Sequence, residues 1–362
     1  MWTPTLLAVA SLASQTPDTK LAVQELWYLE FSGARRFEVS PQLLALSEPN
    51  GVYANDPVSG ESRWFRTDLG EGVSRPELDD DVVVVSVAKA RSAEGPTAPA
   101  TFALDANTGE TLWRSPLGAA EGLTVVGPHV VGIGSMSSDG KIALVGLKRA
   151  DGALAWTREL DGLRKLSAAP EPAGELVLCR VDETLVAVRA STGDVAWRSP
   201  SSELSMDARS NGELVVALGS DGEQGVVRGL IASSGARKWV YPLGAPATGL
   251  EIFGEQVLVF DWKGQLMCLE LATGKERWSV AAEGGSSVDP LVCGQVVLVQ
   301  CILRGNSKPT WRWVGFDLKD GAPLGAVLQA DEIDTLEVGA GRLWWSRPKL
   351  GVLQSLALER KP

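Results

Sequence analysis

Few residues of this 362-residue chain are able to do acid–base or metal chemistry. His129 is the single histidine, so general-base catalysis or metal ligation by imidazole has one candidate. Asp79, Asp80 and Asp81 form an acidic run, but consecutive carboxylates need not converge on one ion. Both features fall at short turns between apolar runs. We therefore interpret them as solvated turn residues, and predict neither a catalytic residue nor a metal ligand.

The four cysteines are scattered through apolar runs. Cys179, Cys268, Cys293 and Cys301 form no CxxC or CxxCH motif and no adjacent pair. Zinc sites and covalent haem attachment use such motifs, so neither is expected here. We predict that all four are small core residues of strands.

The composition narrows the classes of partner. The net charge is −11 at pH 7, whereas binding to nucleic acid relies on clustered Lys and Arg, so we expect no nucleic-acid partner. The chain has 13 Trp against 7 Phe and 3 Tyr. This imbalance predicts a repeated structural role for tryptophan.

One pattern recurs along the chain: an apolar run, a Ser-Gly, Thr-Gly or Asp-Gly turn, and a Trp four residues after the Gly. Alternating apolar runs are typical of half-buried strands, and Gly supplies the positive φ that a tight hairpin turn needs. A Trp on the returning strand can pack a large apolar face between neighbouring units. The six complete copies end at Trp64, Trp113, Trp156, Trp197, Trp239 and Trp278, and a seventh has Gly325 in place of Trp.

A second pattern, a short turn followed by an apolar run, interleaves with the first. It occurs eight times, at intervals of 38 to 48 residues; its turns begin at Pro41, Asp80, Pro128, Gly174, Gly212, Gly254, Gly294 and Gly341. The last copy is followed by one more apolar run and then by the end of the chain. The missing eighth Trp strand is found instead at residues 22–31, which contain Trp27.

The two patterns together predict an all-β fold, an eight-bladed β-propeller with four antiparallel strands in each blade. Joining the N-terminal strand to the last blade closes the ring and removes the exposed edges of an open array. We expect residues 21–362 to form this single propeller, monomeric by itself, and residues 1–20 to be an extension or a signal peptide.

The repeat resembles the pyrroloquinoline-quinone-type repeat, A-x-D-x-x-T-G-x-x-x-W, and residues 103–113 match it best. That repeat occurs in quinoprotein alcohol dehydrogenases and in the propeller of the bacterial outer-membrane assembly machinery. The resemblance extends over residues 21–358 and implies the fold, because the motif is structural and does not bind the quinone. A quinoprotein dehydrogenase would carry a vicinal disulfide, a calcium site and an Asp base. The chain has no adjacent cysteines, so we expect no cofactor and no enzyme; a divergent quinoprotein-like enzyme is the least favoured alternative.

A partner should bind where the blades carry their longer connections. Naming the strands of a blade A to D from the axis outward, the B–C and D–A connections lie on one face of the disc. Residues 88–100, 135–141, 220–225 and 304–310 are predicted long B–C connections, and elaborated loops on a rigid scaffold are where function concentrates. The candidate partner-binding residues on this face are Arg304, Lys308, Trp311, Arg347, Lys349, Arg35, Arg36, Lys89 and Arg91, and blades 3 to 5 supply more acids.

We therefore predict a non-catalytic scaffold that presents this face to a protein partner. The alternative is a module that binds a small ligand or a sugar in the central channel, which would need convergent polar or aromatic groups on the innermost strands. Residues 123–126 and 291–293, assigned to such strands, are apolar and favour the scaffold. Trp344 and Trp345 should occupy opposite sheet faces, one in the core and one at the rim.

The N-terminal residues leave the location of the protein open. Residues 5–12 form an apolar run that is too short to span a membrane. If residues 1–14 are a signal peptide, the protein is exported to the periplasm or cell envelope; otherwise it is cytoplasmic.

Overall fold

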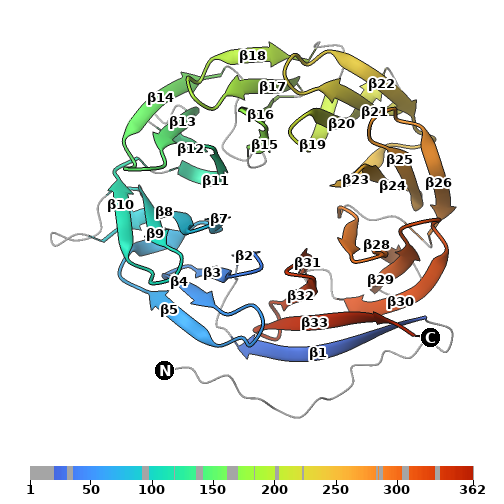
Figure 1. Ribbon diagram of the computed structural model, residues 1–362, viewed down its shortest axis with the longest axis horizontal. Helices are drawn as coiled ribbons and strands as arrows, with labels where there is room; N and C mark the ends of the chain where they lie inside the picture. Colours follow the sequence, from blue (N-terminus) through green and yellow to red (C-terminus); the bar gives the residue numbers. More distant parts are fainter. Residues whose placement is uncertain are drawn as a thin grey trace.

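The fold is a closed ring of eight β-sheets, seen in a computed structural model of the chain (Figure 1). The structure describes residues 20–30, 36–91, 98–117, 119–135, 142–160, 170–182, 184–199, 204–221, 224–282, 284, 288–303, 310–330 and 335–361. All regular structure within these residues is β-strand, so none of them forms a helix long enough to cross a membrane. The predicted eight-bladed propeller is confirmed.

Each blade is an antiparallel sheet whose strand A lies nearest the axis. Blades 1 to 4 consist of β2 (Arg36–Val39), β3 (Leu44–Glu48), β4 (Gly51–Asn55) and β5 (Ser62–Arg66); β6 (Gly70–Val73), β7 (Glu77–Asp79), β8 (Val82–Ala90), β9 (Ala100–Asp105) and β10 (Thr111–Ser115); β11 (Ala119–Val126), β12 (His129–Ser135), β13 (Ile142–Lys148) and β14 (Leu154–Glu159); and β15 (Glu171–Ala173), β16 (Leu176–Val181), β17 (Thr184–Arg189) and β18 (Val195–Arg198). In blade 2, β6 and β7 both pair with β8, so strand A is split in two.

Blades 5 to 7 repeat the arrangement. They consist of β19 (Leu204–Ser210), β20 (Leu214–Asp221), β21 (Gln224–Ile231) and β22 (Arg237–Pro242); β23 (Ala247–Phe253), β24 (Gln256–Asp261), β25 (Gln265–Glu270) and β26 (Glu276–Ala281); and β27 (Leu291–Cys293), β28 (Val296–Leu303), β29 (Thr310–Asp317) and β30 (Pro323–Ala330). The expected long connection at residues 220–225 is wrong, because β20 and β21 stay paired as far as Asp221 and Gln224.

Blade 8 joins the two ends of the described chain. Its strands A to C are β31 (Thr335–Gly339), β32 (Arg342–Arg347) and β33 (Val352–Arg360), and strand D is the N-terminal β1 (Leu21–Glu30). Strands β1 and β33 lie side by side in Figure 1, with a register that runs from Leu21 opposite Arg360 to Glu30 opposite Val352. The predicted closure by the N-terminal strand is thus confirmed.

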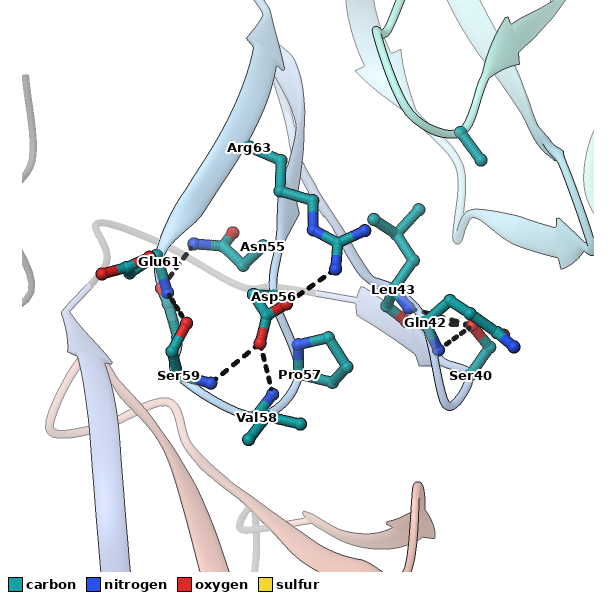
Figure 2. Close-up of polar contacts among 12 residues, drawn as sticks. Ser40, Gln42, Leu43, Asn55, Asp56, Pro57, Val58, Ser59, Glu61 and Arg63 are labelled. Carbon is teal, nitrogen blue, oxygen red and sulfur yellow. Dashed lines mark hydrogen bonds and ion pairs between the residues drawn. The ribbon is translucent and has the colours of Figure 1, made fainter.

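The repeated C–D turn is held by its own side chains, as blade 1 shows (Figure 2). Asp56 Oδ1 accepts hydrogen bonds from the backbone N–H groups of Val58 and Ser59, at 2.8 and 2.9 Å, and Gly60 closes the turn with a φ of 76°. Arg63 donates to Asp56 Oδ2 at 2.6 Å. The hydrogen bond from Arg63, followed by that from Ser59, lowers the pKa of Asp56 to about 2.

Each repeat Trp binds the C–D turn of the following blade. The Trp156 indole N–H, for example, donates to the carbonyl of Ala190 at 2.7 Å, and the ring covers Gly193, where an added Cβ would lie 2.5 Å from the ring. The turn glycine is therefore required both by its φ of 73° and by this close approach. Seven seams share the contact, made by Trp27, Trp64, Trp113, Trp156, Trp197, Trp239 and Trp278 with the carbonyls of Val58, Ala106, Arg149, Ala190, Ala232, Leu271 and Leu318.

The eighth seam, between blades 7 and 8, is sealed in another way. Gly325 holds the Trp position on β30, and Leu21 packs instead against Gly315 and the buried Trp313. The Lys20 N–H donates to Leu324 O at 2.8 Å, and Arg360 pairs with Asp317 at 2.9 Å. This seam therefore depends on the residues at the two ends of the described chain.

The core lies between the blades as a series of apolar clusters. All four cysteines are free and buried in it, as predicted. Trp344 and Trp345 belong to the clusters on opposite sides of blade 8, but they are 0% and 4% exposed. The expectation that one of them reaches the rim is wrong, because blade 8 is packed between two neighbours like every other blade.

Candidate partner-binding face

The B–C and D–A connections define the candidate face, and six of the nine predicted residues on it are described. Arg36 begins β2, and Lys89 and Arg91 lie on either side of Ala90, the last residue of β8. Trp311 is the second residue of β29, Arg347 ends β32, and Lys349 lies in the turn between β32 and β33. Arg35, Arg304 and Lys308 lie outside the described residues. The described members fall into two groups, one on blades 7 and 8 and the other on blades 1 and 2.

The B–C turn of blade 8 presents a lysine and a leucine. The Leu350 N–H donates to Arg347 O at 3.0 Å, and Gly351 turns the chain with a φ of 65°. The Arg347 guanidinium stacks 4.3 Å above the ring of the buried Trp345, a cation–π contact that fixes one wall of the turn. Lys349 is exposed, and Leu350 is 59% exposed.

The B–C turn of blade 6 presents a tryptophan that the sequence analysis missed. Asp261 is buried, and its Oδ1 accepts the backbone N–H groups of Lys263 and Gln265 at 2.9 and 2.8 Å. The carboxylate thereby holds the turn in one shape and leaves Trp262 57% exposed beside the exposed Lys263. A signal was present, since Trp262 belongs to no repeat and stands in an Asp-Trp-Lys-Gly turn.

Blade 7 stands between blades 6 and 8, and Trp311 lies at the B–C end of its strand β29. Trp311 is half-buried and packs against the apolar cluster that blades 7 and 8 share. The B–C ends of three consecutive blades thus carry Trp262, Trp311 and Leu350.

The bases on blade 2 lie close to acids. Lys89 Nζ is 3.9 Å from Glu71, and both side chains are well exposed. Asp68 pairs with Arg66 at 2.7 Å, and the Arg66 hydrogen bond is the largest cause of the lowered pKa of Asp68, with Arg91 adding a smaller charge effect. Exposed pairs of this kind contribute little energy, but they reduce the net positive charge of this part of the face.

The A–B and C–D turns form the opposite face and hold the remaining candidates. His129 begins β12 and is half-buried, so it is less exposed than the solvated turn residue that the sequence predicted. Asp79 and Asp81 converge on one partner, Arg149 of blade 3, at 2.7 Å each. The interpretation of the acidic run as merely solvated is therefore incomplete, because it clamps the turn that receives Trp113.

The inner strands around the central channel were expected to be apolar, but several of them carry paired charged side chains. Arg75 of blade 2 pairs with Glu38 of blade 1 and with Glu337 of blade 8, at 3.1 Å each. Glu77 stands next to this group and accepts the Val125 N–H of blade 3 at 3.3 Å. Burial, followed by the charge of Glu38, raises the pKa of Glu77 to about 7.

A second charged group faces the channel from blades 4 to 7. Arg209 pairs with Asp207 on its own strand at 3.0 Å and with Asp289 of blade 7 at 2.6 Å. Asp289 also accepts the Leu250 N–H at 2.9 Å, and Glu171 and Glu251 complete the group. Burial is the largest cause that raises the pKa of Glu251 to about 7, and the charges of Asp289 and Glu171 add to it. In the part of the chain that is described, no three His, Cys, Asp or Glu side chains are arranged to hold a metal ion.

The family model for the outer membrane protein assembly factor BamB matches residues 101–255 and 223–346. Together these segments span well over half of the chain. The chain belongs to this family. The resemblance of the repeat to the pyrroloquinoline-quinone type is confirmed by the same match.

Solved structures that resemble this one include a BamB, a designed protein and a WD40 domain. BamB from Moraxella catarrhalis is 15% identical with a TM-score of 0.61, over 93% of this chain and 100% of that one. The computationally designed Ika8 protein is 16% identical (TM-score 0.65, 92% and 99%), and the C-terminal WD40 domain of Sif2 is 12% identical (TM-score 0.62, 92% and 98%). None of the curated proteins matches the sequence. At these identities the structural likeness establishes the fold alone.

Proposed function

We propose that the protein is a non-catalytic scaffold that binds a protein partner through the B–C/D–A face. The observation that carries the proposal is the placement of exposed bases and apolar side chains, among them Lys349, Leu350 and Trp262, in turns held by their own hydrogen bonds. Rigid, partly apolar surfaces with Trp and basic side chains are typical of protein interfaces. Membership of a family described as an assembly factor supports the same conclusion.

The alternative, a ligand module that uses the channel, is less well supported. The inner strands do carry convergent polar groups, so the absence of such groups can no longer be used to favour a scaffold over a ligand-binding module. Arg75 and Arg209 are, however, each engaged by carboxylates from other blades. The charged groups of the channel pair with one another, whereas Trp262 and Leu350 on the B–C face are each more than half exposed, and this difference favours the scaffold.

The test begins with capture of partners from the native source and their identification by mass spectrometry. The affinity of an identified partner is then measured for Arg36→Glu/Lys349→Glu and for the control Glu175→Lys/Glu213→Lys on the opposite face. All four side chains are exposed, so folding should change little. We expect the first variant to bind at least about tenfold more weakly, since charge reversal at an interface costs about 1.4 kcal/mol or more. A larger loss in the control would place the partner on the opposite face.

A further inference from the structure

The outer edges of the eight blades are unequal. Strand D is the last strand of each sheet, so one side of its backbone has no strand beside it within the described residues (Figure 1). In blades 1 to 7 strand D is four to eight residues long, whereas β1 of blade 8 has ten. β1 is therefore the longest open edge that the described part of the chain presents.

The shorter edges also carry residues that oppose the addition of a further strand. Lysine or arginine lies on strand D of blades 1 to 6, and β30 of blade 7 begins with Pro323 and contains Gly325. A base, a proline or a short length keeps an exposed edge from pairing with another chain. β1 has the sequence LAVQELWYLE, with no Lys, Arg, Pro or Gly. Its outer edge thus lacks the side-chain protection of the other blades.

The backbone of β1 offers hydrogen bonds to a further strand. Its ten residues pair with β33 in an antiparallel ladder whose register shifts once, at Leu26. In such a ladder alternate residues direct their N–H and C=O groups to the neighbour, and the residues between them direct theirs away. Along Ala22–Glu30, no backbone group of the described residues pairs with this second set. Only another extended backbone can pair with a row of such groups.

Apolar side chains flank this edge on both faces of the sheet. Val23 packs with the cluster shared by blades 7 and 8, whereas Trp27 and Leu29 pack with the cluster shared by blades 8 and 1. The register shift at Leu26 accounts for this change of face. Trp27 is half-buried, although the other six repeat tryptophans are only 7–9% exposed. The turn that binds its indole presents Val58, which is 62% exposed, so apolar surface stays open beside the backbone edge.

We infer that the outer edge of β1, from Val23 to Leu29, is a docking site for an extended segment of a partner protein, which adds to blade 8 as a fifth strand. The site lies on the rim of the disc and is separate from the proposed B–C/D–A face. It therefore adds a second surface and a second mode of binding to the scaffold.

The charged side chains of β1 indicate the chemistry of the segment. β1 contains two, Glu25 and the exposed Glu30, and Glu61 is exposed in the C–D turn that binds Trp27. On blades 1 to 6 a basic segment would instead meet the lysine or arginine of strand D. We therefore expect a segment with apolar residues at alternate positions, which continue the pleat, and with Lys or Arg rather than acids between them.

The bases near the site are engaged or lie beyond its ends. Arg63 pairs with Asp56 at 2.6 Å, and Arg342 donates to two backbone carbonyl oxygens of the same turn at 3.1 and 3.0 Å. Lys20, Lys349 and Lys361 lie beyond the ends of β1. The carboxylates are therefore the charges that a segment along Val23–Leu29 meets directly.

A segment of a partner suits this edge better than a second copy of the chain does. Two copies paired through β1 would bring together two molecules with a net charge of −11 each. The two β1 strands would also place only carboxylates against one another. Like charges oppose association, whereas a basic segment of another protein meets no such repulsion.

The test selects peptides from a phage-displayed library of random dodecapeptides on the immobilised full-length chain. We expect the enriched peptides to alternate apolar with polar residues and to carry a net positive charge. Their affinities are then measured for Gln24→Lys/Tyr28→Lys, which gives β1 the bases of the other edges, and for the control Ala155→Lys/Thr157→Lys on β14. We expect the first variant to bind at least about tenfold more weakly and the control to bind like the wild type. Unchanged melting temperatures confirm folding.

A second measurement needs only the wild-type chain. An enriched peptide is N-methylated at alternate residues, in two versions that cover the two sets of positions. Only one set donates its N–H groups to β1, so one version should lose at least about tenfold in affinity and the other should bind like the parent peptide. Hydrogen exchange of residues 22–30 should also slow when the parent peptide is bound.

Several results would overturn the inference. They are acidic consensus peptides, no enrichment, equal affinities for the wild type and Gln24→Lys/Tyr28→Lys, or equal effects of the two N-methylated versions. A wild-type dimer that Gln24→Lys/Tyr28→Lys dissociates in sedimentation equilibrium would assign the edge to a second copy. Peptide binding that appears only in Leu6→Ser/Leu7→Ser would show that the N-terminal residues of the chain itself occupy the edge.

Discussion

The outer seams of the ring and its inner channel are built on opposite principles. At the outer seams one contact, an indole over a glycine turn with a hydrogen bond to the same turn, recurs seven times with donor–acceptor distances of 2.6 to 3.1 Å. In the channel, two groups of carboxylates surround Arg75 and Arg209, and no two blades contribute the same set. The seams are therefore fixed by the repeat, whereas the inner strands vary from blade to blade.

The seams and the channel should therefore contribute differently to the stability of the protein. Burying an indole removes a large apolar surface from water and is strongly stabilising. Half-buried ion pairs gain Coulomb energy but lose hydration, so they contribute less to stability. The comparison predicts that the seams carry most of the free energy of unfolding and that the channel carries its pH dependence.

Breaking the seam between blades 7 and 8, which has no Trp–Gly contact, should reduce the stability of the protein most. Deleting residues 1–33 removes β1, its ladder to β33, and Trp27. We expect this variant to aggregate or unfold, because it exposes the edge of β33 and loses contacts on both sides of blade 8. Deleting residues 1–19 keeps β1 and Lys20 and should leave a folded propeller. Circular dichroism and thermal melts compare the two; equal melting temperatures would show that the ring closes elsewhere.

Removing a single indole from a seam that has the Trp–Gly contact should have the second-largest effect on stability. Trp156→Ala removes a buried side chain and its hydrogen bond to Ala190, and should lower the free energy of unfolding by about 3–5 kcal/mol. Trp262→Ala removes the same side chain from an exposed turn and should change it by less than about 0.5 kcal/mol. Urea titrations of both variants measure the difference; similar losses would mean that the seams do not carry the stability.

The repeated part of the molecule was predictable from the sequence and the rest was not. The Gly-to-Trp spacing encodes a local turn and a neighbour contact, so Trp27 could be assigned to blade 8 although it is far from β33 in sequence. The channel groups involve partners from several blades, such as Glu38, Arg75 and Glu337, and no periodicity links these positions. The apolar inner strands at residues 123–126 and 291–293 were not representative, because they carry none of the channel's charges.

The candidate face was predictable only in part. Counting the strands places Arg36, Lys349 and Trp311 on the B–C/D–A side of the disc, where the structure also has them. The exposure of Trp262 depends on buried Asp261 holding its turn, a contact that the sequence pattern does not reveal.

The channel should show its role in the pH dependence of stability. The pKa of Glu77 is raised from 4.5 to about 7, which means that the folded protein favours the protonated carboxyl. The contribution of this group to the free energy of unfolding is therefore complete below pH 4.5 and is lost as the pH rises through 7. Relative to the wild type, Glu77→Gln should therefore gain stability between pH 5 and pH 8, by about 1–3 kcal/mol. The exposed control Glu175→Gln should follow the wild-type profile. Urea unfolding at a series of pH values measures this, and parallel profiles for Glu77→Gln and the wild type would contradict it.

The smallest expected effect is the coupling between the two channel groups. Glu77 interacts with Glu38 and Arg75, on blades 1 and 2, whereas Glu251 interacts with Arg209, Asp289 and Glu171, on blades 4, 5 and 7. Since the two sets share no member, Glu251→Gln should shift the pH profile in the same direction as Glu77→Gln, and the double variant should show the sum within about 0.5 kcal/mol. A double-mutant cycle at pH 8 and at pH 5 measures this coupling. If it exceeds about 1 kcal/mol at pH 8 and vanishes at pH 5, the channel titrates as one unit, and its division into two independent arcs is wrong.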